Sequence, residues 1–557
     1  MSARRLPVLA AAIAVAALPA LPASAGPSRL RITAPPGESL LVHGEYPPVQ
    51  SSCADPDQPV LHARYRGTIE VVRRTDGSLS LIGEVGFEDY VRGIAEVPRD
   101  WPMEALKAQV VAARTYALNR LRNADPAGDY DLCATTSCQV YVGMRVEAGP
   151  WGKRWTRAVD RTAGEVLLFQ GEPAITYYSS TSPGRTFDVE DVFGGEALPY
   201  LRGHQEADDQ GSPLSRWRVD MSFDDLARFL AADGLWPGGS IRRVSADQGR
   251  IRVAGDRAVT LSKDSLRDAL NEWAECLSPD RYPRFEPGGY QLPQTVPSIW
   301  YRAEQDGNVL VLTGRGWGHG IGLVQWGAYG KAKRGLGYGD ILAAYYGGLR
   351  PQPVQLPGTI RILIAEGLRS IAVEPSAGVQ TDPSVRPTPP WSMTGGERLR
   401  IRHGRPPSPV LGVDGLRIPR QLTPGAPLDL RLTASDDVDV EVALEGPATA
   451  TVGPLPFEEG RVRITAPVPD LPSGRYRLRA SVTNGVDTIA AGHVSVGVGA
   501  VEAPTPPEGQ PASVAAPEPA PSGGVSTGAL VAAGGVAVAL IALLVLTARR
   551  RRGLHRG

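Results

Sequence analysis

The chain of 557 residues has no excess of either charge and is poor in phenylalanine. Lysine plus arginine and aspartate plus glutamate number 59 each, so no global charge favours a nucleic-acid partner. Phenylalanine numbers only 8, whereas glycine and proline number 64 and 51, a balance that favours turn-rich β or α+β structure over a helical bundle. The length predicts about two or three folded domains.

The two ends of the chain predict export and a membrane anchor. Residues 1–25 combine a basic start, an apolar stretch and Ala23-Ser24-Ala25, the pattern of a secretory signal peptide cleaved after Ala25. Residues 525–547 carry no charge and precede four arginines at 549–552, which favours a single transmembrane helix over a buried core helix. We therefore expect the N-terminal domains outside the cell membrane and the basic tail, residues 548–557, in the cytoplasm.

Cysteine is also scarce, with four residues: Cys53, Cys133, Cys138 and Cys276. An even number in an exported chain predicts disulfides, with three alternative connectivities. Cys133 and Cys138 are close enough in sequence to pair locally, which leaves Cys53 to pair with Cys276. Zinc is the disfavoured alternative because no histidine lies between His62 and His204, so we expect no metal and no other cofactor.

The pattern of apolar residues divides the exported part into three regions and a linker. Residues 28–355 mix short strands with helices and predict an α+β domain, and residues 358–403 predict a short β-rich extension. Residues 406–499 alternate apolar and polar positions between turns, which predicts an all-β sandwich of the immunoglobulin type. Residues 500–524 are rich in proline and alanine and predict a linker to the transmembrane helix.

The stretch from Val91 to Leu121 contains the first candidate for chemistry. A proline-broken turn holds Glu96 between apolar residues, and a long helix follows for which Asp100 is the predicted N-cap. Burial would raise the pKa of such a carboxyl into the range useful to a general acid. The alternative is a solvated surface carboxylate, which is the commoner fate of acidic residues.

A glycine-rich stretch, GRGWGHGIG from Gly314 to Gly322, is the second candidate. It lacks the lysine and the βαβ context of a nucleotide-binding loop. Glycines would let backbone approach an extended ligand, and Trp317, His319, Gln325 and Trp326 suit sugar rings. The alternative is a packed tight turn with tryptophan in the core.

The loop YYSSTSPGRT from Tyr177 contains Ser179 without the G-x-S-x-G arrangement of a serine nucleophile, so it predicts a polar binding loop. In the same loop, Arg185 is a candidate for orienting an anion or for a salt bridge to Asp188 or Glu190.

Four motifs in order resemble the stage II sporulation protein D (SpoIID/LytB) family over roughly residues 30–350. They are AEVPRDWPMEALKAQVVAARTYAL, CATTSCQVYVG, TYYSSTSPGRT with the following EDVFGG and PYL, and GRGWGHGIGLVQWGAYGKAKRG with ILAAYYGG. The resemblance implies an extracytoplasmic protein that acts on peptidoglycan glycan strands. Its members include lytic transglycosylases, whose acid corresponds to Glu96 here, and enhancers of a cell-wall amidase.

The resemblance also implies a substrate groove and raises the question of zinc. The residues that would line the groove are Trp101, Lys107, Gln109, Arg114, Gln139, Tyr177, Ser179, Arg185, Trp317, His319, Gln325 and Trp326. Some family members resemble zinc proteins in which a histidine precedes the cysteine loop, and this chain has no such histidine. We therefore expect either a lytic transglycosylase with Glu96 as acid and base, or a non-catalytic protein that grips glycan and stimulates an amidase.

Overall fold

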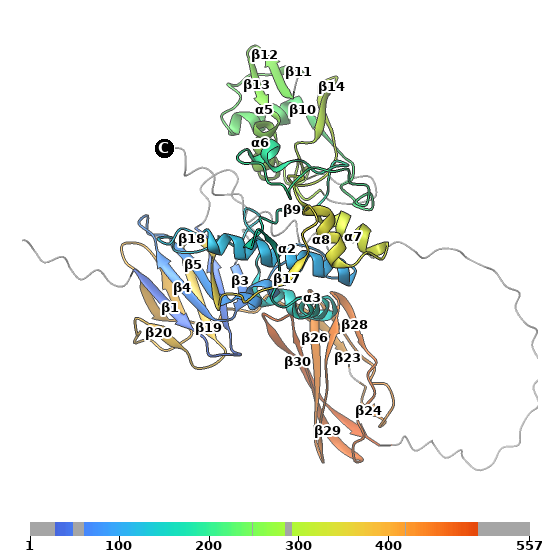
Figure 1. Ribbon diagram of the computed structural model, residues 1–557. Helices are drawn as coiled ribbons and strands as arrows, with labels where there is room; N and C mark the ends of the chain where they lie inside the picture. Colours follow the sequence, from blue (N-terminus) through green and yellow to red (C-terminus); the bar gives the residue numbers. More distant parts are fainter. Residues whose placement is uncertain (1–27, 48–60, 248, 284–291, 418, 500–557) are drawn as a thin grey trace, which may run out of the picture.

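The computed structural model describes residues 28–47, 61–247, 249–283, 292–417 and 419–499. A central layer of helices is flanked by a pair of β-sheets, by an inserted subdomain and by a C-terminal β-sandwich (Figure 1). The first sheet has the strand order β20-β1-β4-β5-β18-β6, and the second has the order β22-β21-β19-β2-β3. Strands of the first sheet are β1 (Arg29–Thr33), β4 (Thr68–Arg73), β5 (Leu79–Gly86), β6 (Leu132–Cys133), β18 (Thr359–Leu368) and β20 (Gln380–Asp382); those of the second are β2 (Leu40–Glu45), β3 (Leu61–Tyr65), β19 (Ser370–Pro375), β21 (Trp391–Thr394) and β22 (Arg400–His403).

Residues 358–403 belong to these N-terminal sheets and are not a separate extension. β18 pairs antiparallel with β5, and β19 pairs antiparallel with β2. The buried side chains of both sheets form one hydrophobic core, to which Ile32, Val71, Ile362 and Val373 all contribute with no exposed surface. The structure therefore differs from the predicted boundary near Gln355, because long-range strand pairing is not visible in local sequence patterns.

The central layer is built around α2 (Met103–Arg122), which is buried on several sides. Its small residues, among them Ala105, Ala108, Ala112 and Ala113, let α3, α7, α8 and β7 pack closely against it. The helix begins after Pro102 as the N-cap and has no side-chain cap, so the predicted Asp100 cap is not used. The other elements of this layer are α1 (Phe87–Arg92), the 3-10 helix η1 (Gly143–Glu147), α3 (Gly149–Arg161), β7 (Glu165–Phe169), β8 (Glu172–Pro173), β9 (Tyr178–Ser179), α4 (Val189–Phe193), β16 (Leu323–Val324), α7 (Gln325–Lys333), α8 (Tyr338–Tyr345) and β17 (Pro351–Pro353).

An inserted subdomain stands above this layer in Figure 1 and has its own hydrophobic core. Two three-stranded sheets, β10-β15-β14 and β11-β12-β13, pack with two helices around residues such as Trp217, Phe229 and Leu270. Ser222 and Ser262 cap the two helices, each accepting a hydrogen bond from a backbone N–H of the first turn. Its elements are β10 (Trp217–Ser222), α5 (Phe223–Ala232), β11 (Ile241–Asp247), β12 (Arg250–Gly255), β13 (Ala258–Ser262), α6 (Lys263–Leu277), β14 (Tyr301–Asp306) and β15 (Val309–Gly314).

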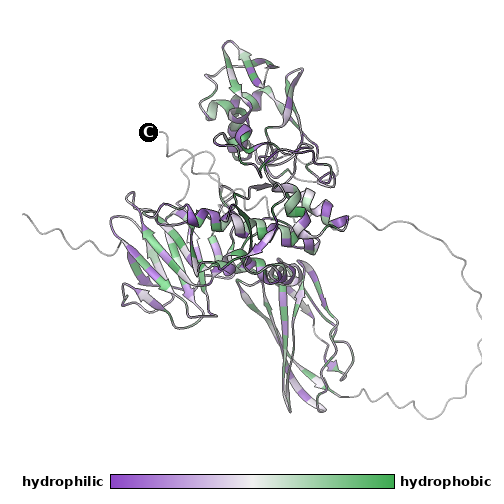
Figure 2. Cartoon of the chain, viewed as in Figure 1, coloured by the Kyte–Doolittle hydropathy of each residue, from purple (hydrophilic) through white to green (hydrophobic). Residues whose placement is uncertain are grey.

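The C-terminal region is a sandwich of a three-stranded sheet, β23-β25-β28, and a five-stranded sheet, β24-β30-β29-β26-β27. Hydrophobic and hydrophilic residues alternate along these strands (Figure 2), and the buried ones meet between the two sheets. Its strands are β23 (Val413–Arg417), β24 (Gln421–Leu422), β25 (Leu430–Ala434), β26 (Val438–Glu445), β27 (Thr449–Phe457), β28 (Gly460–Ile464), β29 (Gly474–Thr483) and β30 (Thr488–Val498).

The predicted fold class needs one correction, which concerns the transmembrane helix. In the part of the chain that the structure describes, no helix is both long enough and apolar enough to cross a membrane. The architecture that it does describe is α+β followed by an all-β sandwich. The predicted signal peptide (1–25), linker (500–524), helix (525–547) and tail (548–557) lie outside the described residues.

Charged side chains join the sandwich to the central layer. Asp437 pairs with Arg99 at 3.2 Å, and Asp439 pairs with Lys153 at 2.9 Å. Asp487 is buried and accepts hydrogen bonds from the backbone N–H groups of Val410 (2.7 Å) and Leu411 (3.0 Å). Its other carboxyl oxygen lies 2.9 Å from Nε2 of the equally buried His62 of β3, so this carboxyl joins the two regions.

We predict that Asp487→Ala lowers the free energy of unfolding by about 3 kcal/mol, because it leaves the N–H groups of Val410 and of the buried Leu411, and the buried His62, without their acceptor. Denaturant unfolding followed by circular dichroism measures the change. Asp429→Ala is the matched control, since its pairs with Arg431 and Arg463 are exposed to solvent and contribute little to stability. Equal effects of the two substitutions would contradict the structural role of Asp487.

Candidate functional site

Glu96 lies in the turn between α1 and α2, and backbone pairing fixes that turn. Ile94 forms an antiparallel bridge with Tyr141, and the N–H of Ala95 donates to the carbonyl oxygen of Val140 at 2.9 Å. The N–H of Val140 in turn donates to Oε1 of Glu96 at 2.6 Å. The carboxyl is therefore held by the segment that follows the cysteine loop, 44 residues further along the chain.

The surroundings of this carboxyl are tyrosines and an amide. Tyr178 hydrogen-bonds to Glu96. Gln139 orients Tyr178, because its Nε2 donates to the Tyr178 hydroxyl at 2.9 Å while its Oε1 accepts from the Tyr90 hydroxyl at 2.8 Å. The Gln139 amide also donates to the carbonyl oxygen of Ala113 in α2 at 3.2 Å, which fixes which side of the amide faces which tyrosine.

Burial raises the pKa of Glu96 to about 7, although the hydrogen bonds from Val140 and Tyr178 oppose the shift. No second carboxylate contributes to this shift among the groups that the structure describes. At neutral pH the protonated and ionised forms are thus both populated, which is what a group that first donates and then accepts a proton requires.

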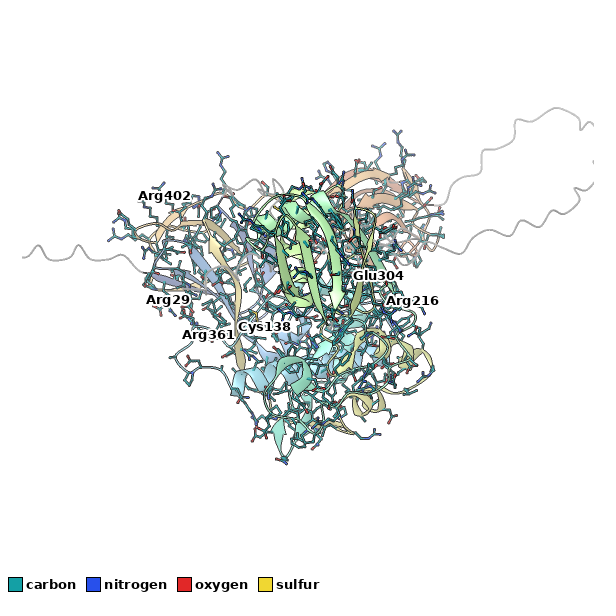
Figure 3. The ribbon with its side chains drawn as sticks, turned by 90° about the horizontal axis from the view of Figure 1, so that it is seen from above. Arg29, Cys138, Arg216, Glu304, Arg361 and Arg402 are labelled. Atoms are coloured by element: carbon teal, nitrogen blue, oxygen red, sulfur yellow. A yellow bond between two sulfur atoms is a disulfide. The ribbon has the colours of Figure 1, made fainter. Side chains whose placement is uncertain are left out.

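The cysteine loop supports this arrangement. Cys133 and Cys138 form a disulfide, and the N–H of Cys133 donates to Sγ of Cys138 at 3.0 Å. Gln139 and Val140 follow directly, so the disulfide closes the loop next to the two residues that hold the Glu96 site. In Figure 3, Cys138 lies near Arg361 of β18, the strand with which β6 pairs. Cys276 is also in a disulfide, and Cys53 lies outside the described residues.

The family resemblance raised the question of a zinc site at the cysteine loop, and the structure of this loop does not fit zinc. The two sulfur atoms are bonded to each other, and no group of three metal-ligating side chains occurs in the described residues.

The glycine-rich loop packs against the segment that carries Tyr177, Tyr178 and Ser179. β16 pairs in parallel with β9, and Trp317 forms a bridge with Thr181. Gly318 and Gly322 have φ of +101° and +68°, and a Cβ on Gly322 would lie 2.2 Å from the carbonyl oxygen of Tyr177. Glycine is required at these positions for close packing, so the packed-turn alternative holds for the backbone of the loop.

The loop places His319 at the site, and helix α7, which begins soon after the loop, places Gln325 there. Nδ1 of His319 accepts from the N–H of Ile321 at 3.0 Å, and burial lowers the pKa of His319 to about 4, so the ring is neutral. The Gln325 amide donates to the carbonyl oxygen of Glu96 at 3.2 Å and to Oε1 of Gln109 at 3.4 Å. Nε2 of Gln109 is buried and has no hydrogen-bond partner among the residues that the structure describes, so this N–H group is available as a donor.

Comparison with known proteins identifies the family of the chain. The model of the family described as stage II sporulation protein matches residues 75–169, which contain Glu96, α2 and the disulfide. An uncharacterized protein of Brachyspira hyodysenteriae is 33% identical over 292 residues, covering 51% of this chain and 71% of the relative. The chain belongs to the stage II sporulation protein D family. The family resemblance read from the sequence is thereby confirmed.

Two named relatives of the family come from Bacillus subtilis. Its stage II sporulation protein D is 27% identical over 297 residues, which cover 50% of this chain and 78% of that protein. Its amidase enhancer is 27% identical over 287 residues, which cover 45% of this chain but only 38% of the enhancer. The chain thus spans well under half the length of the relative whose name states an activity.

Several groove candidates implied by the family resemblance have structural partners in this chain. Arg114 has no exposed surface and binds both carboxylate oxygens of Glu88 at 3.0 and 2.8 Å, so it fastens α2 to α1 and cannot touch a glycan. Trp101 is buried, with its ring 5.0 Å from that of Trp326. Lys107 pairs with Glu104 at 2.6 Å.

The remaining candidates differ in exposure. Gln109 and Gln139 are buried and act through the groups they contact, whereas Arg185 is exposed and donates to the carbonyl oxygen of Thr186 at 3.2 Å. Trp317 is half-buried against the core of the inserted subdomain, and Ser179 is buried, with its Oγ accepting from the N–H of Gly320 at 3.2 Å.

Sequence reasoning did not single out Tyr90, Tyr178 or Phe193. The motif TYYSSTS contains two adjacent tyrosines, and only the direction of β9 decides that Tyr178 turns toward Glu96. The resemblance pointed to Tyr177, whereas it is the adjacent Tyr178 that hydrogen-bonds to Glu96.

We predict that Glu96→Gln changes the pH dependence of stability. The pKa of Glu96 rises on folding from 4.5 to about 7, so the folded protein gains stability from this group below pH 4.5 and loses it as the pH rises to about 7. The variant lacks this loss and should be more stable than wild type at pH 8 by about 3 kcal/mol, with no such gain at pH 4.5. Denaturant unfolding at both pH values measures the difference, and a pH-independent difference would contradict the raised pKa.

Proposed function

We propose that the protein remodels peptidoglycan outside the cytoplasm, as a lytic transglycosylase that uses Glu96 as its single acid and base. The observation that carries the proposal is the Glu96 carboxyl with a pKa of about 7, held by the Val140 N–H and by Tyr178. A disulfide next to this site fits an extracytoplasmic protein, because disulfides persist in oxidising compartments. The predicted signal peptide supports the same location.

A single carboxyl is sufficient for this reaction. Hydrolytic glycosidases use two carboxyls on either side of the bond. In a lytic transglycosylase the C6 hydroxyl of the muramyl residue replaces the external nucleophile. Protonated Glu96 would give its proton to the glycosidic oxygen as that bond to the muramyl C1 breaks. The resulting carboxylate would then accept the proton of the C6 hydroxyl as its oxygen bonds to C1, leaving a 1,6-anhydromuramyl end.

The other groups of the site would keep Glu96 ready for both steps. Tyr178, oriented by Gln139, would donate to the carboxylate after the first proton transfer and limit the rise of its pKa. Gln325 would fix the backbone of the turn through the Glu96 carbonyl oxygen. The neutral His319 would serve as an uncharged hydrogen-bonding and packing group, because its pKa of about 4 leaves no positive charge at neutral pH.

The second candidate function is glycan binding that stimulates an amidase without cleavage. It is favoured by the relative from Bacillus subtilis named an amidase enhancer. It requires the same groove but gives no role to the raised pKa of Glu96, which is why we place it second.

We predict that wild-type protein converts purified, peptide-free glycan strands into products with 1,6-anhydromuramyl ends, detected by mass spectrometry. Glu96→Gln should lower the rate about a hundredfold or more, as expected for loss of a general acid. The wild-type rate should fall as the pH rises above about 7, because the protonated carboxyl is depleted.

Glu172→Gln is the matched control, since this glutamate has 74% of its side chain exposed and pairs only with Arg122 at the surface. It should leave the rate unchanged. Wild type could instead form no anhydromuramyl products and stimulate an amidase as strongly as Glu96→Gln does. That result would contradict the transglycosylase and favour the glycan-binding protein.

A further inference from the structure

Phe193 is an exposed aromatic side chain next to the candidate site. Only three large hydrophobic side chains are classed as exposed in the described part of the chain: Tyr130 at 38%, Phe193 at 52% and Val410 at 58%. Single exposed apolar residues are common and need no explanation by themselves. Phe193 differs from the other two because its ring contacts residues of the Glu96 site.

The ring of Phe193 makes edge-to-face contacts with the rings of Tyr177 and His319. Its centroid lies 5.1 Å from that of Tyr177, with 67° between the planes, and 5.2 Å from that of His319, with 60° between the planes. The rings of Tyr177 and His319 lie 6.0 Å apart, so the three form one cluster. Edge-to-face contacts of this kind are favourable and fix the orientation of the rings.

This aromatic cluster is continuous with the groups that hold Glu96. Tyr177 directly precedes Tyr178, which hydrogen-bonds to the Glu96 carboxyl, and His319 hydrogen-bonds to the backbone of Tyr178. Tyr116 of α2 extends the cluster, with its ring 6.2 Å from that of Tyr177. Tyr116 is also close enough to Glu96 for the two groups to interact electrostatically, so it links the cluster of Phe193 to the side of the carboxyl.

The segment that carries Phe193 is held by hydrogen bonds and an ion pair where α4 begins, and it is exposed where α4 ends. Asp188 accepts from the N–H of Gly203 at 2.6 Å and pairs with Arg202 at 2.8 Å, which anchors the start of α4. Gly194 and Gly195 follow Phe193 with φ of +71° and +85°, and a Cβ on either would meet no atom within 4 Å. Phe193, Gly194 and Gly195 are all exposed, so the ring of Phe193 is accessible to a ligand.

The chemistry around the ring fits an uncharged sugar. A pyranose ring has an apolar face of C–H groups, which gains by covering an exposed aromatic ring. Arg202 pairs with Asp188 and Glu190, so within the described residues the acidic side chains of this segment that have no ion pair are the exposed Asp191 and Glu196. Their negative charge disfavours an anionic group over the ring, which favours N-acetylglucosamine over the lactyl-bearing muramyl residue.

We propose that Phe193, supported by Tyr177 and His319, binds the apolar face of an N-acetylglucosamine ring of the glycan strand next to the bond at Glu96. The inference rests on the proposed function and deepens it by naming the sugar that this part of the groove takes. Phe193 acts in binding and does not take part in proton transfer.

The test uses binding to inactive protein. The parent is Glu96→Gln, and the probes are peptide-free glycan strands and the neutral tetramer of N-acetylglucosamine. Adding Phe193→Ala should weaken binding of both probes about five- to tenfold, the loss expected when the apolar contact area of one aromatic side chain is removed. Phe193→Trp should restore binding. Tyr130→Ala, which removes an exposed aromatic ring elsewhere, should leave binding unchanged.

Two further measurements separate binding from stability. The melting temperature of Phe193→Ala should fall by only a few degrees, because the ring is half exposed and loses only its contacts with Tyr177 and His319. In protein that keeps Glu96, the substitution should raise KM about five- to tenfold with little change in kcat, as for loss of uniform binding.

Unchanged binding of Phe193→Ala, in a protein that still forms anhydromuramyl ends, would overturn this inference alone. Weakened binding of the glycan strands without weakened binding of the tetramer would overturn the assignment to N-acetylglucosamine. If the parent binds neither probe and wild type forms no anhydromuramyl ends, the proposed function and this inference both fail.

Discussion

The hydrogen bond from the Val140 N–H to the Glu96 carboxyl is the contact on which the site depends. A buried carboxylate is costly unless donors surround it, and a carboxyl without any would remain protonated far above neutral pH. Here one backbone donor and one tyrosine hydroxyl partly offset burial, so the pKa stops at about 7. The site is therefore tuned by a balance between burial and two hydrogen bonds. A change that displaces residues 139–140 would therefore change the pKa of Glu96.

Much of the architecture serves to bring distant segments to this carboxyl. The small residues of α2 let three helices and β7 pack closely around one axis. The glycine-rich loop lets β16 lie against β9, which turns Tyr178 toward Glu96 and carries Gln325 to the same turn. The disulfide closes the loop before Gln139. The carboxyl is thus buried because three chain segments pack around the turn of Glu96: residues 139–140, β9, and β16 with the start of α7.

The charged interface between the sandwich and the central layer also contacts the turn that carries Glu96. Arg99, three residues after Glu96, donates to the carbonyl oxygen of Val146 at 2.7 Å and pairs with Asp437 of the sandwich at 3.2 Å. Burial of this cluster is tolerable because each carboxylate faces a cation or backbone N–H groups. The sandwich is consequently part of the framework around the turn, and the sheets that contain β18 and β19 complete that framework on the other side.

The sequence by itself determined the family, the choice of Glu96 and the local Cys133–Cys138 pair, because motifs and short spacings are local properties. It also determined where strands and helices alternate. Only the tertiary structure decided that residues 359–403 complete the N-terminal sheets, that Arg114 is buried with Glu88, and that Tyr178 and Phe193 face the site. Each of these depends on which distant segment covers a given face, and the free energy that selects that segment comes from long-range burial and pairing.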